Sequence, residues 1–372
     1  MFAKERIEEA KNYLDNAIKE NKLPGCSVLI KDKGKETLYV ESGFSDIERR
    51  IPFKREAICH LFSVSKVFTT VAVHKAIELR LLRKEDLVSD YLSPFKHATV
   101  LLENGSLMKE VPSPTIDDLL NMCAGLGYSE GENSQVFQKV SESNFTTSTI
   151  DFANSIAQNP LSYVPRTKRA YSVGADLLGA IIEIVSKMSF GDFMKKYIFE
   201  PAGLKNTGFF LNENQRKKLI PCYRLENNKF VKMNTLNLGI DIKGRKNLFE
   251  SGGAGLFSTI DDVSSFGAAL LEGKILKKET LESLYQEEQN DTRFPPDWMA
   301  PEGMVYKNLL KICRTKKEPE GIPGDFGWNG WLGCHIAINP KINRVYTFFT
   351  QVADYGEGEV NKEFRRILYR NS

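Results

Sequence analysis

The order of strand-like and helix-like segments is the feature that most constrains how this chain can fold. Residues 26–31 and 36–41 are short β-rich runs around a Lys-Gly turn, which predicts a β-hairpin near the N-terminus. Helical patterns fill the middle, and strand-like runs return at 333–339 and 344–351 before a last helix at 361–369. Because strands from both chain ends can share one sheet, we expect an α+β fold with helices inserted in the middle.

The middle of the chain is dominated by helical patterns. Apolar periodicity predicts helices at 67–82, 175–186 and 259–271, and the second of these is almost wholly apolar, which indicates burial. Residues 129–149 are polar and predict a surface excursion. The stretch 211–250 has no clear pattern, and we expect both segments to shape the substrate pocket.

The N-terminal segment favours a packed helix over an export signal. Charged residues fill most of positions 4–9, where a signal peptide would begin an apolar stretch, and apolar residues recur at helical spacing from Ile7 to Ile18. No run of about 18 apolar residues occurs, so no membrane span is expected. We therefore expect a cytoplasmic protein.

The balance of charged residues and the spacing of histidines and cysteines argue against several classes of function. The chain has 51 Lys and Arg against 48 Asp and Glu, spread along its length, which argues against a nucleic-acid partner. Only four histidines occur, far apart from one another, so we expect no metal site and no cofactor. The six cysteines form no C-x-x-C pair and are predicted to be reduced, mostly buried thiols.

A serine three residues before a lysine is the strongest candidate for chemistry. Ser63 and Lys66 lie where the helix predicted at 67–82 begins, so the lysine falls on the same face one turn further on. The helix N-terminus favours negative charge, and an uncharged amine can take the serine proton. The same spacing occurs at Ser93 and Ser106, but only Ser63 opens a long apolar helix. A helix-capping serine is the alternative interpretation.

The residues around this serine resemble a known family. The stretch 61–70 (LFSVSKVFTT) resembles the first motif of the serine β-lactamase and penicillin-binding-protein superfamily. The resemblance covers about residues 25–352. Further blocks resemble the family's motifs in the same order along the chain: 117–126 (DDLLNMCAGL), 171–179 (YSVGADLLG), 199–209 (FEPAGLKNTGF), 251–259 (SGGAGLFST) and 326–330 (FGWNG).

The resemblance implies a β-lactamase/transpeptidase-like fold, with an antiparallel sheet flanked by helices and an inserted all-helical domain. The Trp-x-Gly block and the length of the helical insert look closest to the class C-like branch, which includes carboxylesterases and D-stereospecific peptidases. We expect residues 1–58 and 240–372 to form the α/β domain and residues 59–239 the helical domain. The helix that carries the serine would lie at their interface.

The family's second motif places a tyrosine beside the lysine, and Tyr171 stands at that position. By resemblance, Tyr171 relays protons between nucleophile and leaving group; a buried structural tyrosine is the alternative. Tyr306 and Tyr369 fit the literal Tyr-x-Asn pattern better, but their places in the chain do not match the family's order. Val173 stands where many members have an asparagine, which removes a hydrogen bond to the lysine and to a substrate amide.

Trp328, Asn329 and Gly330 stand where the third motif belongs. The resemblance implies that two N–H groups hold the oxyanion, those of Ser63 and of Trp331, the latter on an edge strand just after this motif. Glycine at 330 would let the substrate approach the strand closely. Because Trp328 replaces the cation that often holds a substrate carboxylate, the motif favours neutral or hydrophobic acyl substrates.

Together these features predict a serine hydrolase that acts through an acyl-enzyme on a small ester, amide or lactam. Carboxylesterase-like and β-lactamase-like activities rank close together, and the missing export signal argues against a cell-wall role. A D-stereospecific peptidase and a catalytically weak, penicillin-recognising binding module are the alternatives. His60 and His335 are weak candidates for a general base, since the chain has no G-x-S-x-G elbow. The natural substrate and the oligomeric state stay open.

Overall fold

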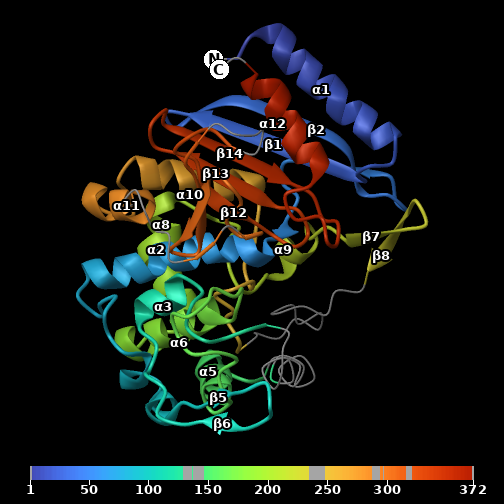
Figure 1. Ribbon diagram of the computed structural model, residues 1–372. Helices are drawn as coiled ribbons and strands as arrows, with labels where there is room; N and C mark the ends of the chain where they lie inside the picture. Colours follow the sequence, from blue (N-terminus) through green and yellow to red (C-terminus); the bar gives the residue numbers. More distant parts are fainter. Residues whose placement is uncertain are drawn as a thin grey trace.

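A large antiparallel sheet lies in the upper part of the molecule as drawn in Figure 1, and most of the helical part lies below it. The computed structural model describes residues 2–128, 136, 146–233, 248–286, 294–295, 297–315 and 321–370. Within these residues the sheet has eight strands in the order β10-β11-β12-β13-β14-β1-β2-β3. The strands are β1 (Gly25–Asp32), β2 (Lys35–Asp46), β3 (Ile51–Pro52), β10 (Met304–Lys307), β11 (Leu310–Cys313), β12 (Phe326–Asn329), β13 (His335–Asn339) and β14 (Arg344–Phe349).

Helices and short sheets complete the fold. The described helices are α1 (Lys4–Lys19), α2 (Ser65–Glu78), α3 (Ile116–Leu120), α5 (Thr149–Ala157), α6 (Gly174–Ser186), α7 (Phe190–Met194), α8 (Glu200–Ala202), α9 (Glu213–Arg216), α10 (Ile260–Leu271), α11 (Lys278–Tyr285) and α12 (Glu359–Tyr369). A π-helical turn, η4 (Lys195–Phe199), joins α7 to α8, and the 3-10 turns are η1 (Phe62–Val64), η2 (Val88–Asp90) and η3 (Ser93–His97). The small two-stranded sheets pair β4 (Cys59–His60) with β9 (Phe257–Ser258), β5 (Val100–Leu101) with β6 (Leu107–Met108), and β7 (Cys222–Glu226) with β8 (Lys229–Met233).

Both chain ends contribute to the large sheet, as the sequence predicts. β1 and β2 form the expected hairpin, with Lys33 at φ +51° and Gly34 at φ +74°, the left-handed geometry that a two-residue hairpin turn requires. β14 pairs directly with β1, with Ser27 opposite Phe349. The β10–β11 hairpin extends the sheet beyond β12 and was not predicted, because its four-residue strands are too short to show a clear alternation.

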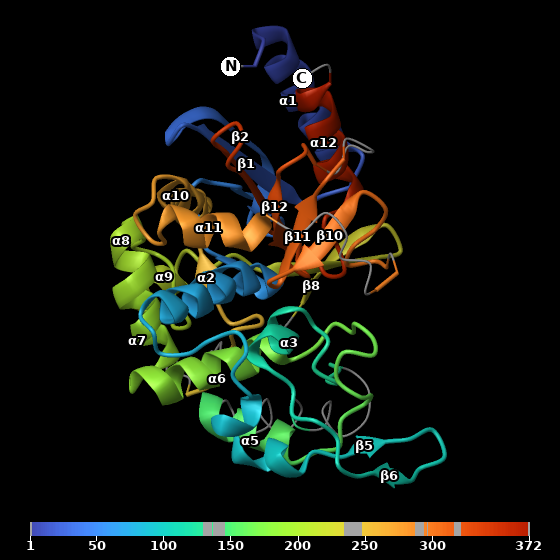
Figure 2. The same ribbon diagram turned by 60° about the vertical axis from the view of Figure 1, so that its left-hand side comes forward.

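Helices cover both faces of this sheet (Figures 1 and 2). α1 and α12 lie side by side on one face, where Leu14 and Phe364 share a buried cluster with Val28. α10 packs on the other face very closely, since a Cβ at Gly267 would lie 2.7 Å from the Val345 side chain. The amphipathic N-terminal helix is thus confirmed, and it packs on the sheet.

α2 connects the sheet to the helical part of the molecule (Figure 2). Its Phe68 ring stacks on Phe266 of α10 with 3.8 Å between ring centres, and α6 contacts it from the helical side. Most side chains along α2 are buried, and these include polar ones such as Thr69 and Thr70. The helix that carries the predicted catalytic lysine is therefore fixed between two layers.

The predicted fold class is confirmed, while the domain division stays a prediction. The strands come from residues 25–52 and 304–349, and helices α2 to α9 lie in the chain between them. The boundary proposed at 239/240 and most of the polar excursion at 129–149 lie outside the described residues.

Two further expectations can be compared with the structure. All six cysteines lie among the described residues, where each is buried and in the thiol form, as predicted. Of the helices that the structure describes, none combines the length and the hydropathy needed to cross a bilayer.

Candidate active site

Ser63 lies in the tight turn η1, which leads from β4 into α2. Phe62, just before it, has φ +47°, in the left-handed region that bulky side chains rarely adopt. Ring contacts of Phe62 with His60, 4.0 Å between centres, and with Trp331, 5.2 Å between centres, hold this conformation. The turn therefore presents the Ser63 side chain at the N-terminal end of α2 in a defined position.

Lys66 lies one turn further along α2, and its side chain is completely buried. Its Nζ donates to Ser63 Oγ at 3.3 Å, to the Gly253 carbonyl oxygen at 2.8 Å and to the Tyr128 hydroxyl at 3.1 Å. Three acceptors match the three donors of an ammonium group. The amine is therefore fixed, with one of its hydrogen bonds on the serine.

Tyr171 completes a triangle with Ser63 and Lys66. Its hydroxyl donates to Ser63 Oγ at 2.6 Å, and Lys66 Nζ lies 4.6 Å from the centre of its ring. Trp328 Nε1 donates to the Tyr171 oxygen at 3.3 Å. The structure thus brings together the three residues predicted as a catalytic set and the tryptophan of the third motif.

A buried tyrosine and a buried carboxylate stand behind Lys66. Burial raises the pKa of Asp176, and the positive charge of Lys66 opposes that shift. Ser251 donates to Asp176 Oδ1 at 2.5 Å, and the Gly253 N–H donates to the same oxygen at 3.0 Å. A Cβ at Gly253 would lie 2.7 Å from both Asp176 Oδ2 and the Tyr128 hydroxyl, so glycine leaves room for these groups to approach each other. Burial and the Asp176 charge raise the pKa of Tyr128.

Sequence reasoning missed Tyr128 and Asp176 as site residues. Asp176 is a carboxylate in the first turn of an almost wholly apolar helix, a pattern that calls for a buried partner and could have identified it. Val173 is fully buried in the apolar core. In this chain the Tyr128 hydroxyl and the Gly253 carbonyl oxygen contact Lys66.

The third motif forms the opposite wall of the site. Trp328 of β12 is buried, and its ring lies edge-on to Tyr306 with 5.1 Å between centres. Gly330 lies directly against the turn before Ser63, because a Cβ at 330 would lie 2.3 Å from the Leu61 carbonyl oxygen. Any side chain at 330 would push the two walls apart.

Two details predicted for the oxyanion side are wrong. β12 is not an edge strand, since β10 and β11 lie outside it, although its described pairing with β11 ends at Gly327. Trp331 lies in the turn between β12 and β13 rather than on a strand, and His335 begins the next strand. The turn closes there because Gly333, at φ +94°, reverses the chain right after Asn329 and Gly330.

The two histidines considered as bases occupy other environments. His60 Nε2 lies 2.8 Å from the Ala254 carbonyl oxygen, and His335 Nε2 lies 3.3 Å from the Arg365 guanidinium. Burial lowers the pKa of each to about 3. Both are therefore neutral at neutral pH, and their described hydrogen bonds go to groups other than Ser63.

The remaining pattern matches take structural positions. Ser93 lies in a short 3-10 turn, and Ser106 is exposed in the β5–β6 hairpin, where its hydroxyl bonds Asn104. Tyr306 is buried behind Trp328, and Tyr369 is the last residue of α12.

An exposed indole borders Tyr171. Trp298 is 68% exposed, with its ring centre 5.2 Å from Tyr171 and 6.3 Å from Trp328. The neighbouring Asp297 pairs with Arg169 at 3.0 Å, and Arg169 lies two positions before Tyr171 in the chain. This ion pair fixes an apolar ring beside the tyrosine.

Comparison with known proteins places the chain in a family. The sequence model described as beta-lactamase matches residues 10–370. Esterase EstB of Burkholderia gladioli is 26% identical over 95% of this chain and 93% of its own length. A putative D-alanyl-D-alanine carboxypeptidase of Salmonella gallinarum is 27% identical over 75% of this chain and 66% of its own length. The solved structure of EstCE1, a hydrolase with promiscuous acyltransferase activity, superposes with a TM-score of 0.80 at 25% identity, covering 98% of both chains. The chain belongs to the beta-lactamase family.

Proposed function

We propose that this protein is a serine hydrolase that works through an acyl-enzyme and prefers neutral esters, with Ser63 as its nucleophile. The observation that carries the proposal is the contact of Ser63 Oγ with both the Tyr171 hydroxyl, at 2.6 Å, and Lys66 Nζ, at 3.3 Å. A nucleophilic serine needs a proton acceptor within hydrogen-bond reach, and these two groups meet that requirement without histidine.

The reaction has two steps. In the first, the uncharged form of the Lys66 amine takes the Ser63 proton as Oγ bonds to the substrate's carbonyl carbon. The bond to the leaving group then breaks as that group takes a proton from the Tyr171 hydroxyl. In the second, water gives a proton to the Tyr171–Lys66 pair and attacks the acyl carbon, which releases the acid and restores Ser63. The Trp328 N–H and the nearby Lys66 ammonium favour the negative charge that develops on the tyrosine oxygen during transfer.

Neutral esters are favoured over charged substrates by the third motif. Trp328 offers one neutral N–H, which already donates to Tyr171, so no cation from this position can hold a substrate carboxylate. The exposed Trp298 ring adds apolar surface beside Tyr171. The name of esterase EstB agrees with an ester substrate, and EstCE1 is described as a hydrolase.

The test compares the wild type with Ser63→Ala on p-nitrophenyl acetate and butyrate. We expect a Ser63-dependent rate on both esters and a much slower rate on nitrocefin. Equal residual rates in the wild type and Ser63→Ala would refute an enzyme at this site and favour a binding module. Faster turnover of nitrocefin or of D-alanyl-D-alanine than of the esters would instead identify a β-lactamase or a D-peptidase. Labelling with a p-nitrophenyl phosphonate, followed by peptide mapping, locates the nucleophile.

A further inference from the structure

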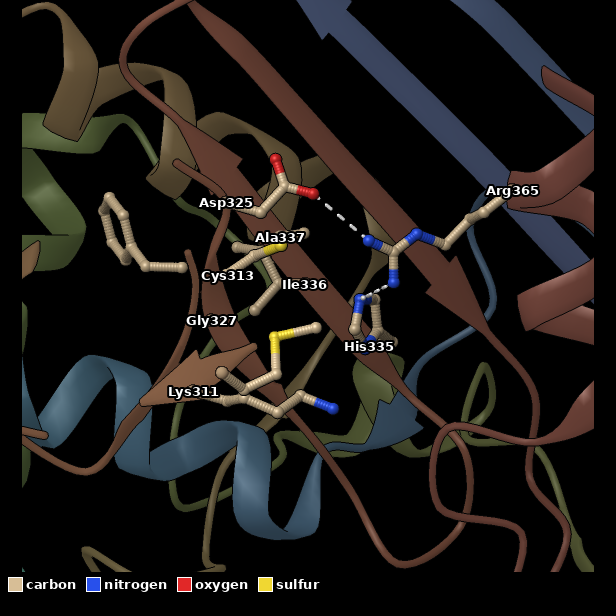
Figure 3. Close-up of a pocket in the computed structure, with 10 residues that line it drawn as sticks. Lys311, Cys313, Asp325, Gly327, His335, Ile336, Ala337 and Arg365 are labelled. Carbon is tan, nitrogen blue, oxygen red and sulfur yellow. Dashed lines mark hydrogen bonds and ion pairs between the residues drawn. The ribbon is translucent and has the colours of Figure 1, made fainter. Parts of the chain in front are cut away.

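A cluster of buried ionic side chains lies on the sheet next to the third motif, and the proposed chemistry makes no use of it (Figure 3). Arg365 reaches in from α12 and donates to Asp325 Oδ2 at 3.1 Å and to Glu357 Oε1 at 2.9 Å. Lys311 of β11 donates to Glu357 Oε2 at 2.6 Å. We call Lys311, Asp325, Glu357 and Arg365 the ion cluster. It ties α12 to the start of β12, to β11 and to the segment before α12.

The ion cluster is largely shielded from water. The Arg365 side chain is 1% exposed and that of Glu357 is 9% exposed. Burial alone would raise the pKa of Glu357, but the charges of Lys311 and Arg365 and the hydrogen bond from Lys311 outweigh that effect and lower the pKa to about 2. Removing one partner from such a cluster leaves the other charges poorly compensated, so the cluster holds its segments firmly.

Glu357 ends a segment that holds the turn after the third motif. The Trp331 carbonyl oxygen accepts the N–H of Tyr355 at 3.2 Å and the N–H of Gly356 at 3.4 Å. Trp331 Nε1 donates to Asp354 Oδ1 at 2.6 Å. The segment 354–357 therefore holds both the carbonyl and the side chain of Trp331, and Glu357 connects the segment to the ion cluster.

The cluster is better explained by positioning than by ligand binding. The cavity beside it, lined by Met304, Cys313 and His335 among others, has a volume of about 20 Å³. That is room for about one water molecule and too little for a substrate or cofactor.

We propose that Glu357 is a positioning residue for ester hydrolysis: by anchoring segment 354–357 to the ion cluster, it fixes the Trp331 peptide so that its N–H faces the developing oxyanion. This inference rests on the proposed function and on the oxyanion role that the family resemblance implies for the Ser63 and Trp331 N–H groups. Loss of the anchor would leave substrate binding largely intact and weaken transition-state binding, because only the transition state carries the full negative charge.

The experiment measures kcat and KM for ester hydrolysis by Glu357→Gln, together with the Ki of a transition-state analogue. Butylboronic acid serves as the analogue, since its tetrahedral adduct with serine places an oxygen where the oxyanion forms. We expect kcat for p-nitrophenyl butyrate to fall about 10- to 30-fold, the Ki of the boronate to rise by a similar factor, and KM to change by less than about 2-fold. Glu357→Asp, which keeps the charge, should recover part of the lost kcat.

Asp32→Asn is the matched control. It breaks the ion pair with Arg344 in the same sheet, 2.6 Å long and with side chains 18% and 14% exposed. We expect a loss of Tm similar to that of Glu357→Gln, with kcat and Ki within about 2-fold of the wild type. Equal kinetic effects in the two variants would show a structural role only and would overturn the inference.

A second variant keeps the inference testable if Glu357→Gln does not fold. Asp354→Gly removes the acceptor of the Trp331 indole at an exposed position whose φ of +59° suits glycine. A fall in kcat with a matching rise in Ki, about 3-fold each, supports the inference, and unchanged values refute it. If the wild type shows no Ser63-dependent hydrolysis, the proposed function itself is wrong. If the wild type is active and these variants do not show the expected changes in kcat and Ki, only the inference about Glu357 is wrong.

Discussion

The two walls of the candidate site are built in different ways. On one wall, Ser63 and Lys66 lie three positions apart on the same helical segment, so local geometry alone brings them together. On the other wall, Trp331 is held by segment 354–357, which itself depends on the ion cluster from three further segments. The difference teaches that the Ser63–Lys66 contact depends on a local motif, whereas the position of Trp331 depends on long-range packing.

The largest expected effects test the local wall. Ser63→Ala should lower kcat for p-nitrophenyl butyrate by about 10⁴-fold or more, and Lys66→Met by about 10³-fold, because they remove the nucleophile and its proton partner. Initial rates and thermal melts on both variants check this. Ser93→Ala, which changes another Ser-x-x-Lys match, is the control and should keep the wild-type rate. More than a tenth of the wild-type rate in Lys66→Met would contradict the proposed role.

The next effect tests how the two walls meet. In Gly330→Ala the new methyl would meet the Leu61 carbonyl oxygen, so Trp331 should move away from Ser63. We expect kcat to fall about 100-fold, together with a lower Tm. Gly208→Ala, whose Cβ would make only ordinary contacts at 3.5 Å, should change neither. Full activity in Gly330→Ala would show that the walls do not need this close approach.

A smaller effect tests whether the wall formed by Ser63 and Lys66 also depends on residues far away in the sequence. Asp176→Asn keeps the size of the side chain but removes the buried negative charge near Lys66. We expect kcat to fall about 10-fold with little change in KM, because the ammonium loses a compensating charge. A rate equal to that of the wild type would mean that Ser63 and Lys66 act without support from α6.

The smallest effect concerns the exposed aromatic ring. Trp298→Ala should lower kcat/KM about 3- to 5-fold for the butyrate ester and less for the acetate, since only part of a short acyl chain can cover the ring. Trp298→Phe should keep most of the preference for the butyrate ester over the acetate ester. An equal loss of kcat/KM on both esters would show that the Trp298 ring does not contact the acyl chain of the substrate.

Much of the fold could be predicted, and the site only in part. Hairpins and helices follow from short-range patterns, so the β1–β2 hairpin, α2 and α6 agree with prediction. Tyr171 was found through its motif block, and its 2.6 Å contact with Ser63 spans 108 positions. Tyr128 escaped prediction, because its role depends on reaching both Lys66 and Asp176 in space.

The sequence by itself determined the α+β class, the sheet shared by both chain ends and the adjacency of Ser63 and Lys66. Each of these depends on residue spacing, and helical and strand periods convert spacing into position. Only the tertiary structure decided that Trp331 lies in a turn, that β12 is inside the sheet, and that Glu357 and Arg365 meet behind the site. Those features depend on which distant segments pack together, and the chain's local periodicity does not encode that choice.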